Sequence, residues 1–170
     1  MQGLDGCSNL EELSLEHNCI TRIEGLSRLT KLKHLSLGHN YITALDSTTL
    51  SNLSQLQYLC MENNKIPSLL GIQKLASLME LYMGNNTIDN VREVFYLKNL
   101  PQLVILDLYG NHVVGATDNY RLFVIYHLKA LKALDGTAIV SPVVSVDLKE
   151  IILCINLIKK KFVELVDSSN

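Results

Sequence analysis

One frame of apolar residues and an asparagine recurs five times and restricts what this chain can fold into. The frame reads Leu-x-x-Leu-x-Leu-x-x-Asn-x-Ile, with Met or Val replacing an apolar residue in some copies. The copies begin at Leu10, Leu32, Leu56, Leu78 and Leu103, so the steps between them are 22, 24, 22 and 25 residues. Units of this length stack on one another because a single copy cannot bury its apolar face alone. We therefore expect one elongated domain of stacked repeats.

Each copy predicts a short strand followed by a turn. The two leucines of Leu-x-Leu point to the same side of a strand, so strands from successive copies should form one curved parallel sheet with leucines in its core. The asparagine amide both donates and accepts hydrogen bonds, so stacked asparagines can satisfy backbone groups of the turns. The positions of this predicted ladder are Asn18, Asn40, Asn64, Asn86 and Asn111.

The segments that return from one strand to the next carry apolar residues at steps of three or four. This spacing predicts short 3₁₀ or α turns on the convex side, and the copies of 24 and 25 residues have room for a fuller helical turn. The predicted fold is an α/β, right-handed leucine-rich-repeat solenoid with a curved parallel sheet and short convex helices.

The whole pattern, LxxLxLxxNxIxxIxxLxxL, resembles the intracellular leucine-rich repeats of the protein phosphatase 1 regulatory-subunit type. Similar repeats occur in the spliceosomal A-prime protein, an axonemal dynein light chain and many ciliary proteins. The fifth copy is followed by Asn119-Tyr120-Arg121, Tyr126-His127-Leu128 and Leu131-x-x-Leu134-Asp135-Gly136, which resemble the C-terminal cap of this family. The resemblance covers residues 4–136. It implies that a helix and a final strand-like turn cover the last repeat.

Three parts are predicted along the chain: repeats over 1–116, a cap over 117–136 and an amphipathic helical tail over 137–170. The first repeat is partial, which indicates a fragment or shortened form of a longer array, or self-association through an open end. In the tail, apolar residues from Val144 to Leu165 predict a helix of about 20 residues. That helix could pack on the cap or convex side, associate with a second helix, or lie on a membrane surface.

The positions that flank the inward leucines should face the concave side. In four columns of such positions, acidic residues outnumber basic ones six to one, although the chain has a net charge of only −2, and three tyrosines cross them diagonally. Rigid aromatic side chains in an acidic field suit a basic or amphipathic protein segment. The predicted partner-binding residues are Glu12, His34, Tyr58, Met79, Glu80, Tyr82, Ile105, Asp107 and Tyr109. The alternative is a solvated face, with binding by the convex side, the tail or further repeats.

Other kinds of site find little support in the sequence. His17 and His39 share one frame position and Cys19 is close to them, but a structural zinc site needs four ligands and the next two copies carry asparagine there. Cys60 lies on an open curved sheet, which offers no oxyanion hole. Glycine-rich nucleotide-binding motifs are absent. We therefore predict no enzymatic activity, no metal and no cofactor.

The predicted function is a non-catalytic scaffold for a protein partner. The resemblance implies a ciliary or axonemal assembly, with a phosphatase regulatory subunit and a protein component of a ribonucleoprotein as alternatives. Direct binding to nucleic acid is not expected, because the concave face is acidic, and the tail is too charged to span a membrane. Four scattered cysteines and the absence of an apolar leader predict an intracellular location.

Overall fold

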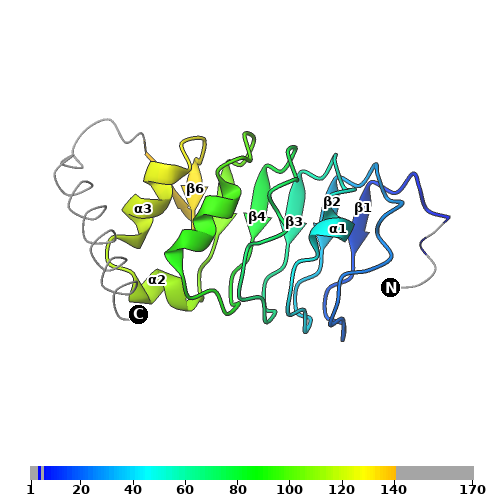
Figure 1. Ribbon diagram of the computed structural model, residues 1–170, viewed down its shortest axis with the longest axis horizontal. Helices are drawn as coiled ribbons and strands as arrows, with labels where there is room; N and C mark the ends of the chain where they lie inside the picture. The colour runs from blue at the N-terminus through cyan, green and yellow to red at the C-terminus, as the bar shows by residue number, and fades with distance from the viewer. Residues whose placement is uncertain (1–3, 5, 141–170) are drawn as a thin grey trace, which may run out of the picture.

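The computed structural model describes residue 4 and residues 6–140. Within these residues, seven short strands form one sheet in chain order, and the chain advances along it from β1 at one end to β6 and β7 at the other (Figure 1). Strands β1 to β6 are parallel, whereas β7 runs antiparallel to β6. Their bounds are β1 Glu12–Ser14, β2 His34–Ser36, β3 Tyr58–Cys60, β4 Glu80–Tyr82, β5 Ile105–Asp107, β6 Ala133–Leu134 and β7 Thr137–Ala138. The predicted leucine-rich solenoid is confirmed.

Equivalent residues of the repeat lie opposite one another in the sheet. Leu13 pairs with Leu35, and Leu81 pairs with Leu106, so the sequence frame and the strand register coincide. The inward leucines of the middle copies are fully buried, whereas Leu13 and Leu15 of the first copy are only partly buried. The core therefore runs the length of the sheet and becomes more exposed toward β1.

Helical turns occur in the two longest copies, where the sequence left room for them. They are α1 (Ser47–Leu50) and the 3₁₀ helix η1 (Val91–Leu97). Asp46 and Asn90 precede them, and each side chain accepts a hydrogen bond from a backbone N–H in the first turn. The two shorter arms return through turns without a helix.

The last repeat is covered by α2 (His112–Ala116), α3 (Tyr120–His127) and the β6–β7 hairpin. The Arg121 guanidinium ties these elements together, because it donates to the carbonyls of Leu134, Thr137 and Ala138. The hairpin crosses position 136, the predicted boundary between cap and tail, because β7 pairs with β6. The helix predicted from Val144 onward lies outside the described residues.

Candidate partner-binding surface

The side chains that flank the inward leucines form two columns across the strands. The strand register places Glu12, His34, Tyr58, Glu80 and Ile105 in the first column, and Ser14, Ser36, Cys60, Tyr82 and Asp107 in the second. All of them are exposed or half-buried except Cys60, which is 4% exposed. The sequence assignment of these positions to one face therefore agrees with the geometry, whereas their role in binding remains a prediction.

Three aromatic side chains form a continuous ridge on this face. The His34 and Tyr58 ring centroids are 5.8 Å apart, and those of Tyr58 and Tyr82 are 5.3 Å apart. We call His34, Tyr58 and Tyr82 the aromatic ridge. The Tyr82 hydroxyl donates to Glu80 Oε2 at 2.9 Å, which fixes the orientation of its ring. Burial, together with neighbouring acidic groups, raises the pKa of Tyr58 and of Tyr82 to about 12, so both phenols keep their protons.

The acidic side chains around the ridge are only partly neutralised. Lys33, the basic residue of this face, lies 2.8 Å from Glu11 Oε2, and this hydrogen bond lowers the pKa of Glu11. His34 Nδ1 lies 3.7 Å from Glu12 Oε1. Because Lys33 is already paired at one end of the face, the carboxylates of the middle copies give the surface an acidic character that favours a basic partner.

The remaining predicted contact residues lie around the ridge. Met79 is 40% exposed and Tyr109 is 66% exposed, while Ile105 and Asp107 are half-buried. Asp107 Oδ1 accepts a hydrogen bond from Tyr109 N at 2.7 Å, so this carboxylate is held at the end of β5. The predicted diagonal of three tyrosines thus consists of two tyrosines in ring contact and a third, Tyr109, at the exposed edge.

The predicted binding residues include only Tyr109 from the third column, whose other members are Glu16, Gly38, Glu62 and Gly84. Glu62 Oε2 is 3.7 Å from the Cys60 sulfur, and the Ser36 hydroxyl donates to Glu16. Burial raises the pKa of the Cys60 thiol, which keeps it protonated and poorly nucleophilic. The repeat frame contains this alternation of glutamate and glycine. It does not show which atoms lie next to the glycines.

The asparagines form hydrogen bonds between successive copies. Asn64 Oδ1 accepts from Ile42 N at 2.9 Å, and its amide donates to Leu37 O and Met61 O at 3.0 Å each. Asn40, Asn86 and Asn111 make equivalent bonds and are also buried. Asn18 is exposed and donates only within its own copy. These residues hold the turns, and the binding surface depends on them for its shape.

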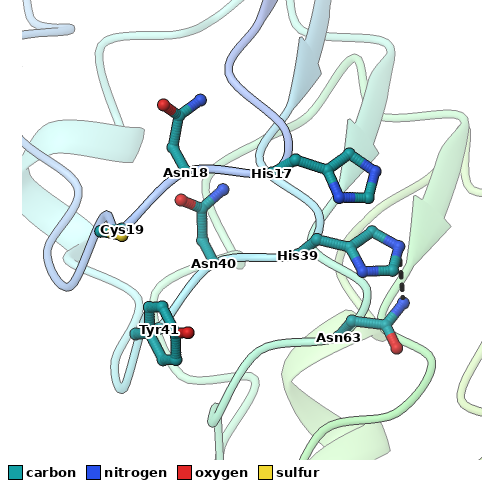
Figure 2. A pocket seen from close by; sticks show the side chains of 7 residues that line it. All are labelled: His17, Asn18, Cys19, His39, Asn40, Tyr41 and Asn63. Carbon is teal, nitrogen blue, oxygen red and sulfur yellow. Dashed lines mark hydrogen bonds between the residues drawn. The ribbon is translucent and has the colours of Figure 1, made fainter.

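A hollow lies beside these turns and contains the two histidines considered as metal ligands. Figure 2 shows the His17 and His39 rings side by side, with centroids 4.1 Å apart, and Asn63 Nδ2 3.3 Å from His39 Nε2. In this view Cys19 lies on the far side of Asn18 from both rings. Within the part of the chain that the structure describes, no group of three or more His, Cys, Asp or Glu side chains could hold a metal ion.

The backbone conformation accounts for the residue types at this turn better than metal binding does. The position before each ladder asparagine has a left-handed φ: 55° at His17, His39 and Asn63, 53° at Asn85 and 74° at Gly110. Histidine, asparagine and glycine tolerate this conformation better than most residues. This requirement was not predicted from the sequence, although the residue types at the five positions are its signal.

Comparison with known proteins agrees with the geometry. A family model described as "Leucine Rich repeats (2 copies)" matches residues 8–52 and 30–77. Internalin C2 of Listeria monocytogenes is similar in structure, with a TM-score of 0.64 and 27% identity over 77% of this chain and 53% of the internalin. This chain thus spans about half the length of that relative.

Two further structures are similar. A chain of the Drosophila melanogaster SNF/U2A′ complex has a TM-score of 0.65 and 26% identity, over 76% of this chain and 75% of that chain. A leucine-rich-repeat protein of Leptospira interrogans has a TM-score of 0.64 and 26% identity, over 76% of this chain and 32% of that chain. The described part of our chain is therefore a leucine-rich-repeat solenoid.

No helix among residues 6–140 is long and apolar enough to cross a membrane.

Proposed function

We infer that this chain is a non-catalytic interaction scaffold that binds a basic or amphipathic protein segment on its concave face. The observation that carries this proposal is the aromatic ridge surrounded by acidic side chains. Tyrosine rings provide large contact areas at a small cost in conformational entropy, and they are enriched at the centres of protein interfaces. The carboxylates around them would attract a basic segment and exclude an acidic one.

The proposal is tested by affinity capture from a ciliated-cell extract followed by mass spectrometry. The wild-type chain is compared with a Tyr58→Ala/Tyr82→Ala variant, which removes two rings of the ridge. Tyr41→Ala is the matched control, because Tyr41 is 50% exposed beside the turns rather than on the concave strands. We expect partners to be lost in the double variant and retained in the control.

A shortened chain ending at Val140 separates the concave face from the tail, because it retains the β6–β7 hairpin. Partners that survive the double variant but are lost from the shortened chain would contradict the concave assignment and move binding to the tail. Circular dichroism and thermal unfolding of each variant exclude loss of the fold as the cause.

The assembly in which the scaffold acts is a finer proposal. The resemblance of the repeats to ciliary proteins favours an intracellular ciliary or axonemal assembly, and resemblance to the phosphatase regulatory type gives the first alternative. A role in a ribonucleoprotein is favoured by the similarity to a chain of the SNF/U2A′ complex. In that role the acidic face would bind a protein component rather than RNA phosphates. The identities of the captured partners discriminate among the three assemblies.

A further inference from the structure

Four rings gather where η1 packs against α3, at the capped end of the solenoid (Figure 1). We call Phe95, Phe123, Tyr126 and His127 the cap cluster. The His127 ring lies at its centre, with its centroid 5.0 Å from those of Phe95 and Tyr126 and 4.3 Å from that of Phe123. The cluster belongs to a convex arm and to the cap, so it is separate from the aromatic ridge on the concave strands.

Two rings of the cap cluster remain exposed. Phe95 is 41% exposed and Tyr126 is 40% exposed, whereas Phe123 is buried. Lys98 Nζ lies 4.1 Å from the Phe95 centroid, and Lys129 Nζ lies 4.3 Å from that of Tyr126, so two ammonium groups border the exposed rings. Large apolar side chains that are exposed together, rather than scattered singly, mark a contact surface.

The chain leaves the described residues beside this surface. Arg121 of α3 donates to the carbonyls of Thr137 and Ala138, which holds β7 against the first turn of that helix. Tyr126 is further along α3 by a rise of about 7.5 Å. Residues 139–143 can span up to about 17 Å when extended. The segment that follows them is therefore tethered within reach of the cap cluster.

That segment carries the apolar pattern of a helix that has to be covered. Its apolar residues follow one another at alternating steps of four and three, which places them on one face of the predicted helix. We call this face the tail stripe: Val144, Leu148, Ile151, Ile155, Ile158, Phe162 and Leu165. Asp147 and Glu150 border one side of its first half. These carboxylates complement the two ammonium groups beside the cap cluster.

We propose that the tail stripe docks on the cap cluster of its own chain and covers the rings of Phe95 and Tyr126. A short tether gives the stripe a high effective concentration at this surface, which favours it over a separate partner with a similar apolar face. The inference goes beyond the proposed function, because it concerns the cap and a convex arm. Docking there extends the cap and leaves the concave face open to a partner.

The experiment uses tryptophan fluorescence in the full chain, which contains no tryptophan of its own. Tyr126→Trp places a reporter in the cap cluster, and Tyr41→Trp places one beside the turns, where Tyr41 is 50% exposed. Ile155→Asp introduces a charge at the centre of the tail stripe. Asn156→Asp is the matched control, because it introduces the same charge at the next residue, about 100° around the helix.

Acrylamide quenching measures how far water and solutes reach each reporter. We expect Ile155→Asp to raise the quenching constant of the Tyr126→Trp reporter at least about twofold, because the ring loses the apolar side chains that cover it. Asn156→Asp should leave that constant unchanged, and the Tyr41→Trp reporter should respond to neither substitution. Hydrogen exchange measured by mass spectrometry is the reciprocal test. Phe95→Asp should accelerate exchange over residues 144–165, whereas Tyr41→Asp should not.

The inference is overturned if Ile155→Asp leaves the quenching constant unchanged, or if Asn156→Asp raises it equally. A response of the Tyr41→Trp reporter also overturns it, because the tail would then support the whole fold instead of one surface. Quenching that depends on protein concentration would place the tail stripe on a second chain, which contradicts docking within one chain. Exchange over residues 144–165 that is unaffected by Phe95→Asp would exclude the cap cluster as the docking surface.

Discussion

Asn64 forms hydrogen bonds with the backbone of two copies, and its side chain is buried among the groups that it bonds. Replacing it with alanine leaves Ile42 N without its acceptor in a place that water reaches poorly. The carbonyls of Leu37 and Met61 each lose one of two donors and keep those of Asn40 and Asn86. We expect Asn64→Ala to lower the free energy of unfolding by about 1–3 kcal/mol. Urea denaturation monitored by circular dichroism measures this loss.

Asn18→Ala is the control for that change, because Asn18 is exposed and bonds only to carbonyls of its own copy. Asn18→Ala should lower the free energy of unfolding clearly less than Asn64→Ala does. Equal losses at the two positions would show that the bonds between copies contribute nothing beyond the local turn.

His127 gives the cap a dependence on pH. It lies among aromatic rings, 4.3 Å from the Phe123 centroid and 5.0 Å from that of Phe95, and its Nδ1 is 2.8 Å from Phe123 O. Burial is the largest cause that lowers the pKa of His127 below its ordinary value of 6.5. The unfolded chain therefore binds the proton more readily, so this residue's contribution to stability is present above pH 6.5 and is lost as pH falls through the pKa of the folded state.

His127→Gln replaces the imidazole N–H by an amide N–H donor and does not titrate. Between pH of about 8 and about 5, the wild type should lose more stability than this variant. Chemical denaturation at a series of pH values measures the difference. Parallel pH profiles for the two proteins would rule out His127 as the origin.

At the scale of the element, the turn after β5 requires glycine for two reasons. Gly110 has a φ of 74°, and a Cβ atom there would lie 2.0 Å from Asn85 Oδ1. Alanine would be strained in the left-handed conformation and would also displace the Asn85 side chain. We therefore expect Gly110→Ala to lower the free energy of unfolding by about 1–3 kcal/mol. Thermal unfolding provides the measurement.

Gly115, near the end of α2, offers the opposite case. Nothing lies within 4 Å of a Cβ atom at this position, so Gly115→Ala should leave stability unchanged or raise it by up to about 1 kcal/mol. Similar destabilisation by both substitutions would indicate that the loss comes from glycine replacement in general and not from the turn at Gly110.

Sequence periodicity predicted the elements of the sheet well, because each inward leucine belongs to a frame that the strand register repeats. Leu35 and Leu59 are paired as their frame positions require, and the convex helices occur in the two longest copies. The left-handed turn at His17 and His39 was missed, because periodicity reports which side chains are buried and not the sign of φ.

At the scale of the whole molecule, the sequence predicted which face carries the aromatic and acidic residues but not how they are arranged on it. The 5.3 Å contact of Tyr58 with Tyr82 depends on two side-chain rotamers in different columns. Likewise, the oxygens around Gly84 come from Glu62, Asp107 and Tyr109, which belong to two other copies. Distances between side chains of different copies depend on how the copies stack. The repeat frame in the sequence does not specify them.

The two kinds of segment in each repeat differ in how freely their length can vary. Steps of 22 to 25 residues separate the copies, yet the strands remain paired in one register from β1 to β5. Extra residues are accommodated in the convex arms, as in η1, while the distance from one strand to the next is fixed by backbone hydrogen bonds. Insertions in those arms can therefore accumulate during evolution without altering the spacing of the strands on the concave side.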